Sequence, residues 1–361
     1  MNVAALRLRN QHLLTTTLTR AEDVVRALGA VQSQDYANAK WAIGRRMTAA
    51  TDADVEHAIA SGAILRTHVL RPTWHFVLPE DVDWMLDLTA TRVAAAMGTN
   101  NRSLGLDASV FRRANAAIER ALRDGAQLTR AELAVALRRA RVDPTGQRLA
   151  HILMQAELDR VVISGGRRGK QFTYASYDTR VPRSPKRDCD DALRDLAERY
   201  FATRGPATLQ DFAWWSGLTV ADAKRAVEAS DGAVVRERIA DRDLWVTPGA
   251  RAPTRKTRTT PVVHLLPNYD ELFVGFRDRS AFGVRLGREP RLDALMGHML
   301  FVDGQLVGGW RRTLGKFVAV TLRLLVPVSQ RERALIHKEV ERLGAFLQLR
   351  TAHTIVGATK D

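Results

Sequence analysis

The residues best suited to chemistry are two glutamines, Gln32 and Gln34, separated by one residue. Gly29 is expected to end the preceding helix and the next helix is expected to begin near Asp35 or Tyr36, so both glutamines fall in a short extended linker. In an extended chain, residues i and i+2 point to the same side. Two amides that converge on one point can hold a water molecule or face a sugar oxygen. Two glutamines that merely cap helix ends would have no chemical role, and the residues alone leave both interpretations open.

Several other kinds of chemistry find little support. The nine histidines include no His-x-x-x-His pair and Cys189 is the only cysteine, so neither a zinc site nor a disulfide is expected. The stretch Gly165–Lys170 is followed by Gln171 instead of Ser or Thr, which argues against a phosphate-binding loop. A Gly-x-Ser-x-Gly nucleophile elbow is also missing from the sequence. We therefore expect neither a metal nor a cofactor.

The composition is that of a globular protein with a strong positive charge. In 361 residues, 55 Lys and Arg stand against 40 Asp and Glu, a net charge of +15 that favours polyanionic partners. Arginines that only decorate solvated surfaces are the alternative. Residues 160–187 hold eight basic residues against one acidic residue, and a second basic cluster comprises Arg251, Arg255, Lys256 and Arg258. Basic residues concentrated in loops favour a nucleic-acid partner.

The sequence contains no apolar run long enough to span a bilayer. Residues 1–14 lack the apolar core of a signal peptide and alternate apolar residues with Arg and Asn. We expect a cytoplasmic protein without a membrane partner.

The glutamine linker belongs to the first of three similar units. Helices are predicted at 20–28, 36–46 and 52–61, followed by strands at Ile64–Leu70 and Thr73–Val77. Thr19 and Glu22 have the spacing of a capping box. In the second unit we predict helices at 104–123 and 145–158. Between them, a capping box at Thr129–Glu132 begins a helix that extends to residue 139. A hairpin follows at 161–174, whose loop carries Arg167, Arg168 and Lys170.

The third unit repeats this order, with helices predicted at 193–203, 208–216 and 219–228 and strands at 234–235 and 244–246. Helices followed by a hairpin are typical of winged helices, although any α+β protein yields some such patterns by chance. We predict an α+β fold of three tandem winged-helix units, at 1–100, 101–187 and 188–258. A β-rich, barrel-like domain at 259–361 follows, with a hairpin turn at Asp303-Gly304 and a closing helix at 328–349. Trp41, Trp84, Trp214 and Trp215 are expected to pack in the core.

Several segments resemble one known family. They are the paired glutamines, Leu70–Phe76, Leu266–Leu272, Phe276–Ser280 and Val302–Arg312. From about Leu8 to its end, the chain is similar to the bacterial winged-helix DNA glycosylases typified by the azinomycin-resistance enzyme. The resemblance implies tandem winged helices, a C-terminal β-barrel, and removal of N7-alkylated purines, including bulky adducts and interstrand crosslinks.

The resemblance also implies a catalytic motif of Gln, an apolar residue and Gln, matched by Gln32 and Gln34. Ser33 departs from the apolar middle position, which is expected to pack inward. The second glutamine places the chain in the Gln–Gln branch of the family, not in the sister branch with Asp. Asp35 could instead be the carboxylate that matters, or it could simply cap the following helix.

An N7-alkylpurine is already cationic, so its departure needs no general acid. A neutral amide does not titrate near pH 7, but its carbonyl oxygen can orient a water molecule and face an oxocarbenium-like sugar. We expect Gln32 and Gln34 to share these roles.

Further residues are expected to line the site or contact DNA. They are Asn38, Lys40, Arg66, Thr67, His68, Arg71, Thr73, Trp74 and His75 in the first unit, and Arg167, Arg168 and Lys170 in the second. Structural roles for His68, Trp74 and His75 remain open. Asp270 and Arg277 match recurrent family positions, but a structural ion pair would explain them equally well.

These observations predict a monofunctional DNA glycosylase of base excision repair. It would act as a monomer on duplex DNA that carries N7-alkylguanine, and it would serve self-resistance to a DNA-alkylating antibiotic. The alternative is a non-enzymatic winged-helix transcriptional regulator, although no dimerisation helix is evident. A scaffold protein would not explain the basic hairpin loop.

Overall fold

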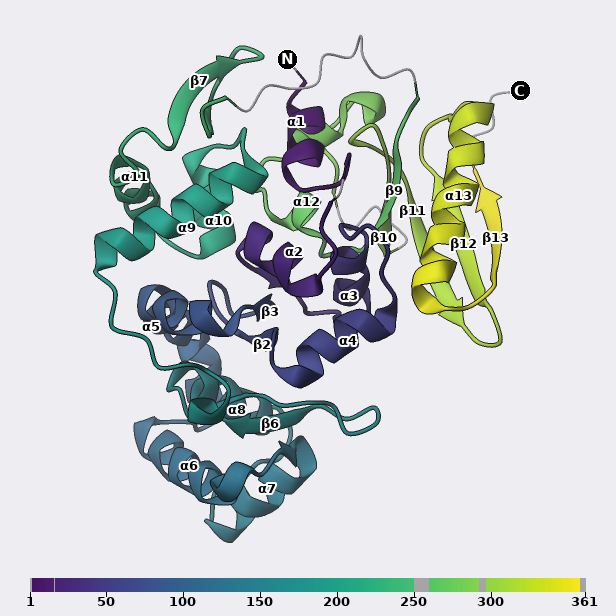
Figure 1. Ribbon diagram of the computed structural model, residues 1–361. Helices are drawn as coiled ribbons and strands as arrows, with labels where there is room; N and C mark the ends of the chain where they lie inside the picture. Colours follow the sequence, from purple (N-terminus) through teal and green to yellow (C-terminus); the bar gives the residue numbers. More distant parts are fainter. Residues whose placement is uncertain (1, 16, 250–259, 292–296, 358–361) are drawn as a thin grey trace.

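The computed structural model describes residues 2–15, 17–249, 260–291 and 297–357. Figure 1 shows a first unit at the centre, a second below it, a third at the upper left and a C-terminal sheet at the right. The predicted basic cluster from Arg251 to Arg258, and the expected boundary at residue 258, lie outside the described residues. In the part of the chain that is described, no helix has the length and apolar character needed to cross a membrane.

The first unit contains the glutamine pair. After α1 (Val3–Asn10) it comprises α2 (Ala21–Leu28), β1 (Val31–Gln32), α3 (Tyr36–Gly44), α4 (Asp52–Ser61), β2 (Leu65–His68) and β3 (Trp74–Val77). The strands form a sheet in the order β1-β3-β2. The capping box expected at Thr19 is wrong: Arg20 is the N-cap residue, so Glu22 lies one position too early to close a box. A capping box instead begins α4 at Thr51.

Helix α5 (Pro79–Ser103) leads into the second unit and runs across the boundary expected at residue 100. This unit comprises α6 (Ala108–Ala121), β4 (Leu128–Thr129), α7 (Arg130–Arg139), α8 (Arg148–Leu158), β5 (Val162–Ser164) and β6 (Thr173–Ser176). Its sheet has the order β4-β6-β5. The predicted capping box is confirmed, since Thr129 and Glu132 bond each other's backbone.

The third unit comprises α9 (Cys189–Arg204), α10 (Leu209–Ser216), α11 (Val220–Glu228), β7 (Val235–Ile239) and β8 (Arg242–Val246). Ala207, between its first two helices, pairs with Trp245 of β8. All three units thus share one connection, in which a short extended segment after the first helix pairs with the last hairpin strand. The recurrence of this long-range pairing supports a structural repeat better than the recurring element order does.

The C-terminal region comprises β9 (Val263–Leu266), α12 (Glu271–Val274), β10 (His298–Val302), β11 (Gln305–Leu314), β12 (Val318–Leu324), α13 (Gln330–Leu347) and β13 (Thr351–Val356). The five strands form an open sheet in the order β13-β12-β11-β10-β9, so the described strands do not close into the expected barrel. Strand β13, which was not predicted, follows the predicted closing helix and pairs parallel to β12. Asp303 and Gly304, both with positive φ, make the predicted turn.

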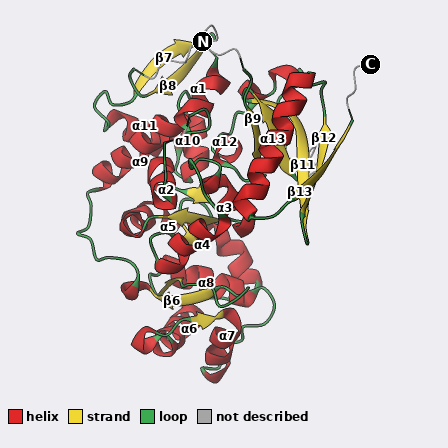
Figure 2. Cartoon of the chain, turned by 45° about the vertical axis from the view of Figure 1, so that its right-hand side comes forward, coloured by secondary structure: helices red, strands yellow, loops and turns green. Residues whose placement is uncertain are grey.

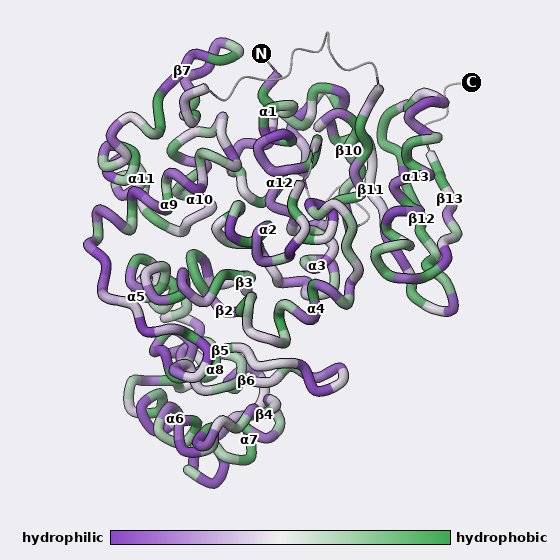
Figure 3. The backbone as a smooth tube through the Cα atoms, viewed as in Figure 1, coloured by the Kyte–Doolittle hydropathy of each residue, from purple (hydrophilic) through white to green (hydrophobic). Residues whose placement is uncertain are grey.

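Helix α13 packs against this sheet and the first unit (Figure 2), and Trp41 lies 5.2 Å from Phe346, centroid to centroid. Trp41, Trp84 and Trp215 are buried as predicted, but Trp214 is 45% exposed and not a core residue. The backbone of α13 alternates hydrophilic and hydrophobic colours in Figure 3, as a helix with one buried face requires.

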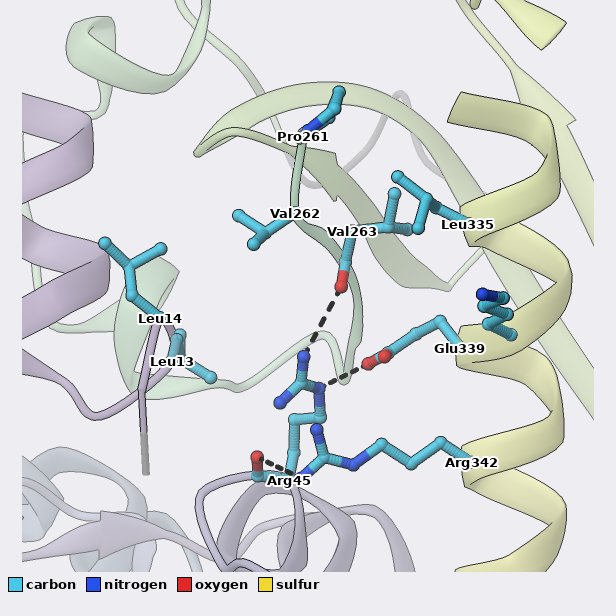
Figure 4. A pocket seen from close by; sticks show the side chains of 10 residues that line it. Leu13, Leu14, Arg45, Pro261, Val262, Val263, Leu335, Glu339 and Arg342 are labelled. Atoms are coloured by element: carbon cyan, nitrogen blue, oxygen red, sulfur yellow. Dashed lines mark hydrogen bonds and ion pairs between the residues drawn. The ribbon is translucent and has the colours of Figure 1, made fainter. Parts of the chain in front are cut away.

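Buried arginines also join the first unit to the C-terminal region. Figure 4 shows Arg45 between the Glu339 carboxylate of α13 and the Val263 carbonyl, while Arg342 donates to the carbonyl of Arg45. These residues line a cavity of about 300 Å³ with apolar neighbours such as Leu13. Arg45, Arg342 and Glu339 form hydrogen bonds within this junction, so we interpret the cavity as part of a structural contact between the first unit and the C-terminal region.

Candidate active site

The first glutamine lies in strand β1, which pairs with β3, and Gln34 follows two residues later. Val31 lies opposite Phe76 and Gln32 lies opposite His75, and the Ser33 N–H donates to the Trp74 carbonyl at 2.7 Å. Directly opposed residues of an antiparallel pair project from the same face of a sheet. Gln32 and His75 therefore share one face of the sheet, and Gln34 lies beyond the end of the strand, at a bend.

The two glutamines differ in exposure. Gln32 is buried: its N–H donates to Glu271 Oε1 at 2.8 Å, and its side-chain oxygen accepts a hydrogen bond from Arg71 at 3.4 Å. Gln34 is exposed, and its side-chain oxygen accepts from the Trp74 N–H at 3.4 Å. Both side chains thus bond the β2–β3 hairpin and not a helix terminus. One amide is anchored and the other is open to solvent.

His75 supplies a neutral acceptor on the glutamine face. Its Nδ1 lies 2.9 Å from the Thr73 carbonyl, a geometry that requires the proton on Nδ1. Complete burial, aided by the charge of Arg71, lowers the pKa of His75 well below its ordinary value. His75 Nε2, Arg71 Nε and Thr73 Oγ1 are buried without a hydrogen-bond partner among the described residues. Buried polar atoms normally have partners, so this group is suited to a polar ligand or water.

The opposite face of the same sheet carries Arg66, Trp74 and His68. The Arg66 guanidinium donates to the Ser33 carbonyl at 2.9 Å and lies 4.2 Å from the centre of the Trp74 ring. Burial lowers the pKa of Arg66 to about 10, which leaves it protonated. Ser33, in the middle of the motif, is fully buried. Arg66 therefore binds the backbone between the two glutamines, from the sheet face opposite Gln32.

Thr67 and His68 anchor the hairpin to the second unit. Glu157 of α8 accepts hydrogen bonds from Thr67 Oγ1 at 3.0 Å and from the His68 backbone at 3.0 Å, and it lies 2.8 Å from His68 Nδ1. All three residues are buried. The expected contacts of Thr67 and His68 with DNA are therefore replaced by a structural role.

Asp35 and Asn38 form the start of α3. The Asp35 carboxylate caps the helix and accepts from the Asn38 backbone at 3.3 Å and from its side chain at 2.7 Å. Asp35 thus takes the capping role that the sequence left open. Asn38 also lies 3.3 Å from His298 Nε2 of β10. Lys40 is buried between Asp52 and Glu56, at 2.7 and 2.6 Å, so its ammonium group is not available to DNA as expected.

The hairpin loop of the second unit projects away from its helices (Figure 3). Arg168 and Lys170 are exposed, and Arg168 pairs with Glu132 at 2.8 Å. Arg167 instead folds back on the first unit, 3.5 Å from Glu56 and 5.3 Å from the centre of the Tyr36 ring. Arg167 thus joins two units, whereas Lys170 remains the residue of the three most open to a polyanion.

Asp270 and Arg277 do not meet. Asp270 is fully buried and accepts two hydrogen bonds of 2.8 Å from Arg46. Arg277 is exposed, and its backbone donates to Asp211 at 2.9 Å. The ion-pair interpretation therefore holds for Asp270 with Arg46 as the partner, and the position of Arg277 is compatible with a surface contact.

Sequence reasoning missed three residues near the glutamines. Glu271 bonds Gln32, pairs with Arg204 at 2.6 Å and accepts from Trp215 at 3.0 Å. Its signal was its place in the same segment as Asp270. His298 reaches Asn38, and burial lowers the pKa of Arg312, whose charge interacts with Asp35. Arg312 lies in another of the segments that carried the family resemblance, whereas His298 had no signal.

No group of three or more His, Cys, Asp or Glu side chains within the described ranges could hold a metal ion.

Comparisons with known proteins show the family and the fold. A curated protein of Streptomyces sahachiroi, named an interstrand DNA cross-link repair glycosylase, is 26% identical over 225 residues, which span 60% of this chain and 60% of that protein. The solved structure of Streptomyces sahachiroi DNA glycosylase AlkZ matches with a TM-score of 0.80 at 21% identity and covers 98% of both chains, so the fold is shared. The sequence profile of one family, described as DNA glycosylase AlkZ-like, matches residues 25–346. This match covers most of the sequence, and the chain belongs to the AlkZ-like DNA glycosylase family.

Proposed function

We propose that this protein is a monofunctional DNA glycosylase that hydrolyses the N-glycosidic bond of cationic N7-alkylpurines, bulky N7-alkylguanines included, in duplex DNA. The observation that carries the proposal is that the amide oxygens of Gln32 and Gln34 both accept hydrogen bonds from the β2–β3 hairpin, with one amide buried and the other exposed. Family membership supports the reaction class. The name of the curated relative supports crosslinked and bulky adducts as substrates.

In this mechanism the positive charge of the alkylated purine makes it a good leaving group. The C1′–N9 bond breaks, its electron pair neutralises the purine, and a water oxygen bonds C1′ and loses one proton to solvent. Gln34, the exposed amide, orients that water, while Gln32 presents a fixed dipole to the developing positive charge on the sugar. His75 is a neutral acceptor on the face of Gln32, and the positive charge nearest to the Gln32 amide is that of Arg71, which holds its oxygen.

We also infer that the three repeated units are winged helices, since each shows a helix, a short extended segment, two helices and a hairpin. We further propose that the protein acts as a monomer. Removal of natural-product adducts would give its host resistance to the corresponding antibiotic. Light scattering of the protein with one duplex tests the stoichiometry, and one chain per duplex is the expected result.

The decisive experiment measures abasic sites after incubation with duplexes that carry N7-methylguanine or a bulky N7 adduct. We expect release from at least one duplex, and a loss of about 100-fold or more for Gln32→Ala combined with Gln34→Ala, as for other preorganised dipoles. Gln147→Ala is the matched control, because Gln147 is exposed and its side chain makes no cap hydrogen bond with α8. Undiminished release by the double variant would refute the glutamine mechanism. No release with intact sequence-specific binding would favour a regulator.

A further inference from the structure

A second concave site lies on the sheet face opposite the glutamines, between the first and second units. Its volume is about 180 Å³, room for about six water molecules at about 30 Å³ each. It is lined by Arg66 and Trp74 of the β2–β3 hairpin, and by Arg130, Ser164, Phe172, Thr173 and Tyr174 of the second unit. Arg66 and Trp74 were expected to line the glutamine site, and no separate pocket was expected.

Arg66 is a cation built into the wall of this pocket. It is only 8% exposed, and its charge interacts with that of Glu157, but no carboxylate of the described residues lies within ion-pair distance of it. Trp74 and Phe172 lie 4.2 and 4.8 Å from its guanidinium carbon, centroid to carbon. Its Nε and Nη2 already donate to the Ser33 carbonyl. Buried charges normally have a partner, so the free part of the guanidinium is suited to an anion.

Two further groups of the second unit face the same pocket. Arg130 is exposed and occupies the first turn of α7, whose N-terminus also favours negative charge. Tyr174 is buried, and its hydroxyl makes no hydrogen bond within the described residues. Two guanidinium groups and a phenol hydroxyl around one cavity form a donor set that matches a phosphate.

The pocket adjoins the glutamine pair through one residue. Trp74 provides a ring to the pocket wall, while its backbone N–H donates to Gln34. The carbonyl of Ser33, between the two glutamines, is the group that Arg66 holds. A phosphate in the pocket would therefore lie across the hairpin from the nucleotide that the glutamines face.

We propose that this pocket binds one DNA backbone phosphate next to the lesion, through Arg66, Arg130 and Tyr174. The proposal rests on the proposed function only in taking duplex DNA as the ligand. A phosphate bound in the pocket would also contact Arg66, the residue that holds the strand of the glutamine pair. DNA binding would therefore be coupled to the position of the glutamines.

The first test measures the salt dependence of binding to an undamaged duplex by fluorescence anisotropy, which needs no excision activity. Arg130→Gln should reduce the magnitude of the slope of log K against log[salt] by about 0.9, the value for one phosphate. Tyr174→Phe should weaken binding severalfold with an unchanged slope. Arg139→Gln, at the other end of α7, is the matched charge control. Equal slope changes for Arg130→Gln and Arg139→Gln would refute a specific pocket.

The second test places single methylphosphonates along a duplex whose central tetrahydrofuran abasic analogue sets the register. At one position near the analogue, the methylphosphonate should weaken binding by the wild-type protein about tenfold. The same methylphosphonate should hardly change the affinity of Arg130→Gln or Tyr174→Phe, because these variants already lack the phosphate contact. The phosphate assignment is wrong if the effects of the methylphosphonates and of these variants on affinity are additive at every position. If the effect of removing one base is instead non-additive with these variants, the pocket binds a nucleobase. A failure of excision with intact coupling would overturn the proposed function and not the pocket.

Discussion

At the scale of single residues, Glu271 connects more of the site than any residue that the sequence singled out. Its carboxylate accepts from the Gln32 backbone, from Arg204 of α9 and from Trp215 of α10. Both Glu271 and Arg204 are fully buried. One side chain of the C-terminal region therefore holds the glutamine strand against the third unit.

Glu271→Gln should destabilise the protein by about 3–5 kcal/mol, because it leaves the Arg204 guanidinium buried without a compensating charge. Urea denaturation measures this loss. Glu80→Gln, which breaks the exposed pair of Glu80 with Arg26, should cost less than about 1 kcal/mol. Similar losses for the two variants would show that the buried pair contributes no more than a surface one.

At the scale of elements, the turn between α10 and α11 fits against the turn of the β2–β3 hairpin. Gly217 has a φ of +72°, and a Cβ there would lie 2.0 Å from the Leu70 carbonyl oxygen. Leu70 itself has a positive φ of 64°. Arg92 of α5 donates to the Gly217 carbonyl at 2.7 Å. This close approach sets the position of the hairpin that carries Arg71 and His75.

Gly217→Ala should therefore cost more than the strain of a left-handed alanine, which is about 1–2 kcal/mol. The clash with Leu70 should add about 1–3 kcal/mol, as overpacking does elsewhere. Gly125→Ala is the control, since Gly125 has a φ of +75° with nothing within 4 Å of the added Cβ. Urea midpoints and excision rates should fall further for Gly217→Ala, and equal midpoints would contradict the close packing of the two turns.

At the scale of the whole molecule, the core encloses two neutral histidines in addition to its arginine ion pairs. His264 lies fully buried in β9, 2.8 Å from the Leu13 carbonyl, and His75 lies fully buried in β3. Burial lowers the pKa of both imidazoles well below the ordinary value, and neighbouring arginines lower it further. The folded protein therefore excludes two protons that the unfolded chain binds below about pH 6.5.

The free energy of unfolding should consequently be highest above about pH 7.5 and should decrease as the pH falls below about 6.5, because the unfolded state then binds more protons. Each histidine should contribute about 1.4 kcal/mol per pH unit. Urea denaturation at pH 7.5, 6.5 and 5.5 measures the slope of the free energy of unfolding against pH. His264→Gln should decrease this slope by the contribution of one proton. A free energy that does not change between pH 7.5 and 5.5 would contradict the burial of neutral imidazoles.

Local sequence patterns predicted many of the elements. The helices near 20–28, 36–46 and 52–61, the capping box at Thr129 and the turn at Asp303-Gly304 depend on neighbouring residues, and the structure contains them. The extended conformation at Gln32 was also predictable, because a helix stop and a helix start lie on either side of the linker, but the bend at Gln34 was not expected.

The tertiary structure alone decided which partners these residues meet. Lys40 is a surface cation by its type, but it is buried between Asp52 and Glu56. Strand β13 pairs with β12 and forms one edge of the sheet, whereas β9, far away in sequence, forms the other edge. The two edge strands do not pair, so the sheet is open. Burial and pairing depend on contacts between distant segments, which no local pattern encodes. The sequence by itself determined where the glutamines are and that the chain at Gln32 is extended. The fold determined that Glu271, Arg71 and His75 lie near Gln32, since these residues come from two other segments of the chain.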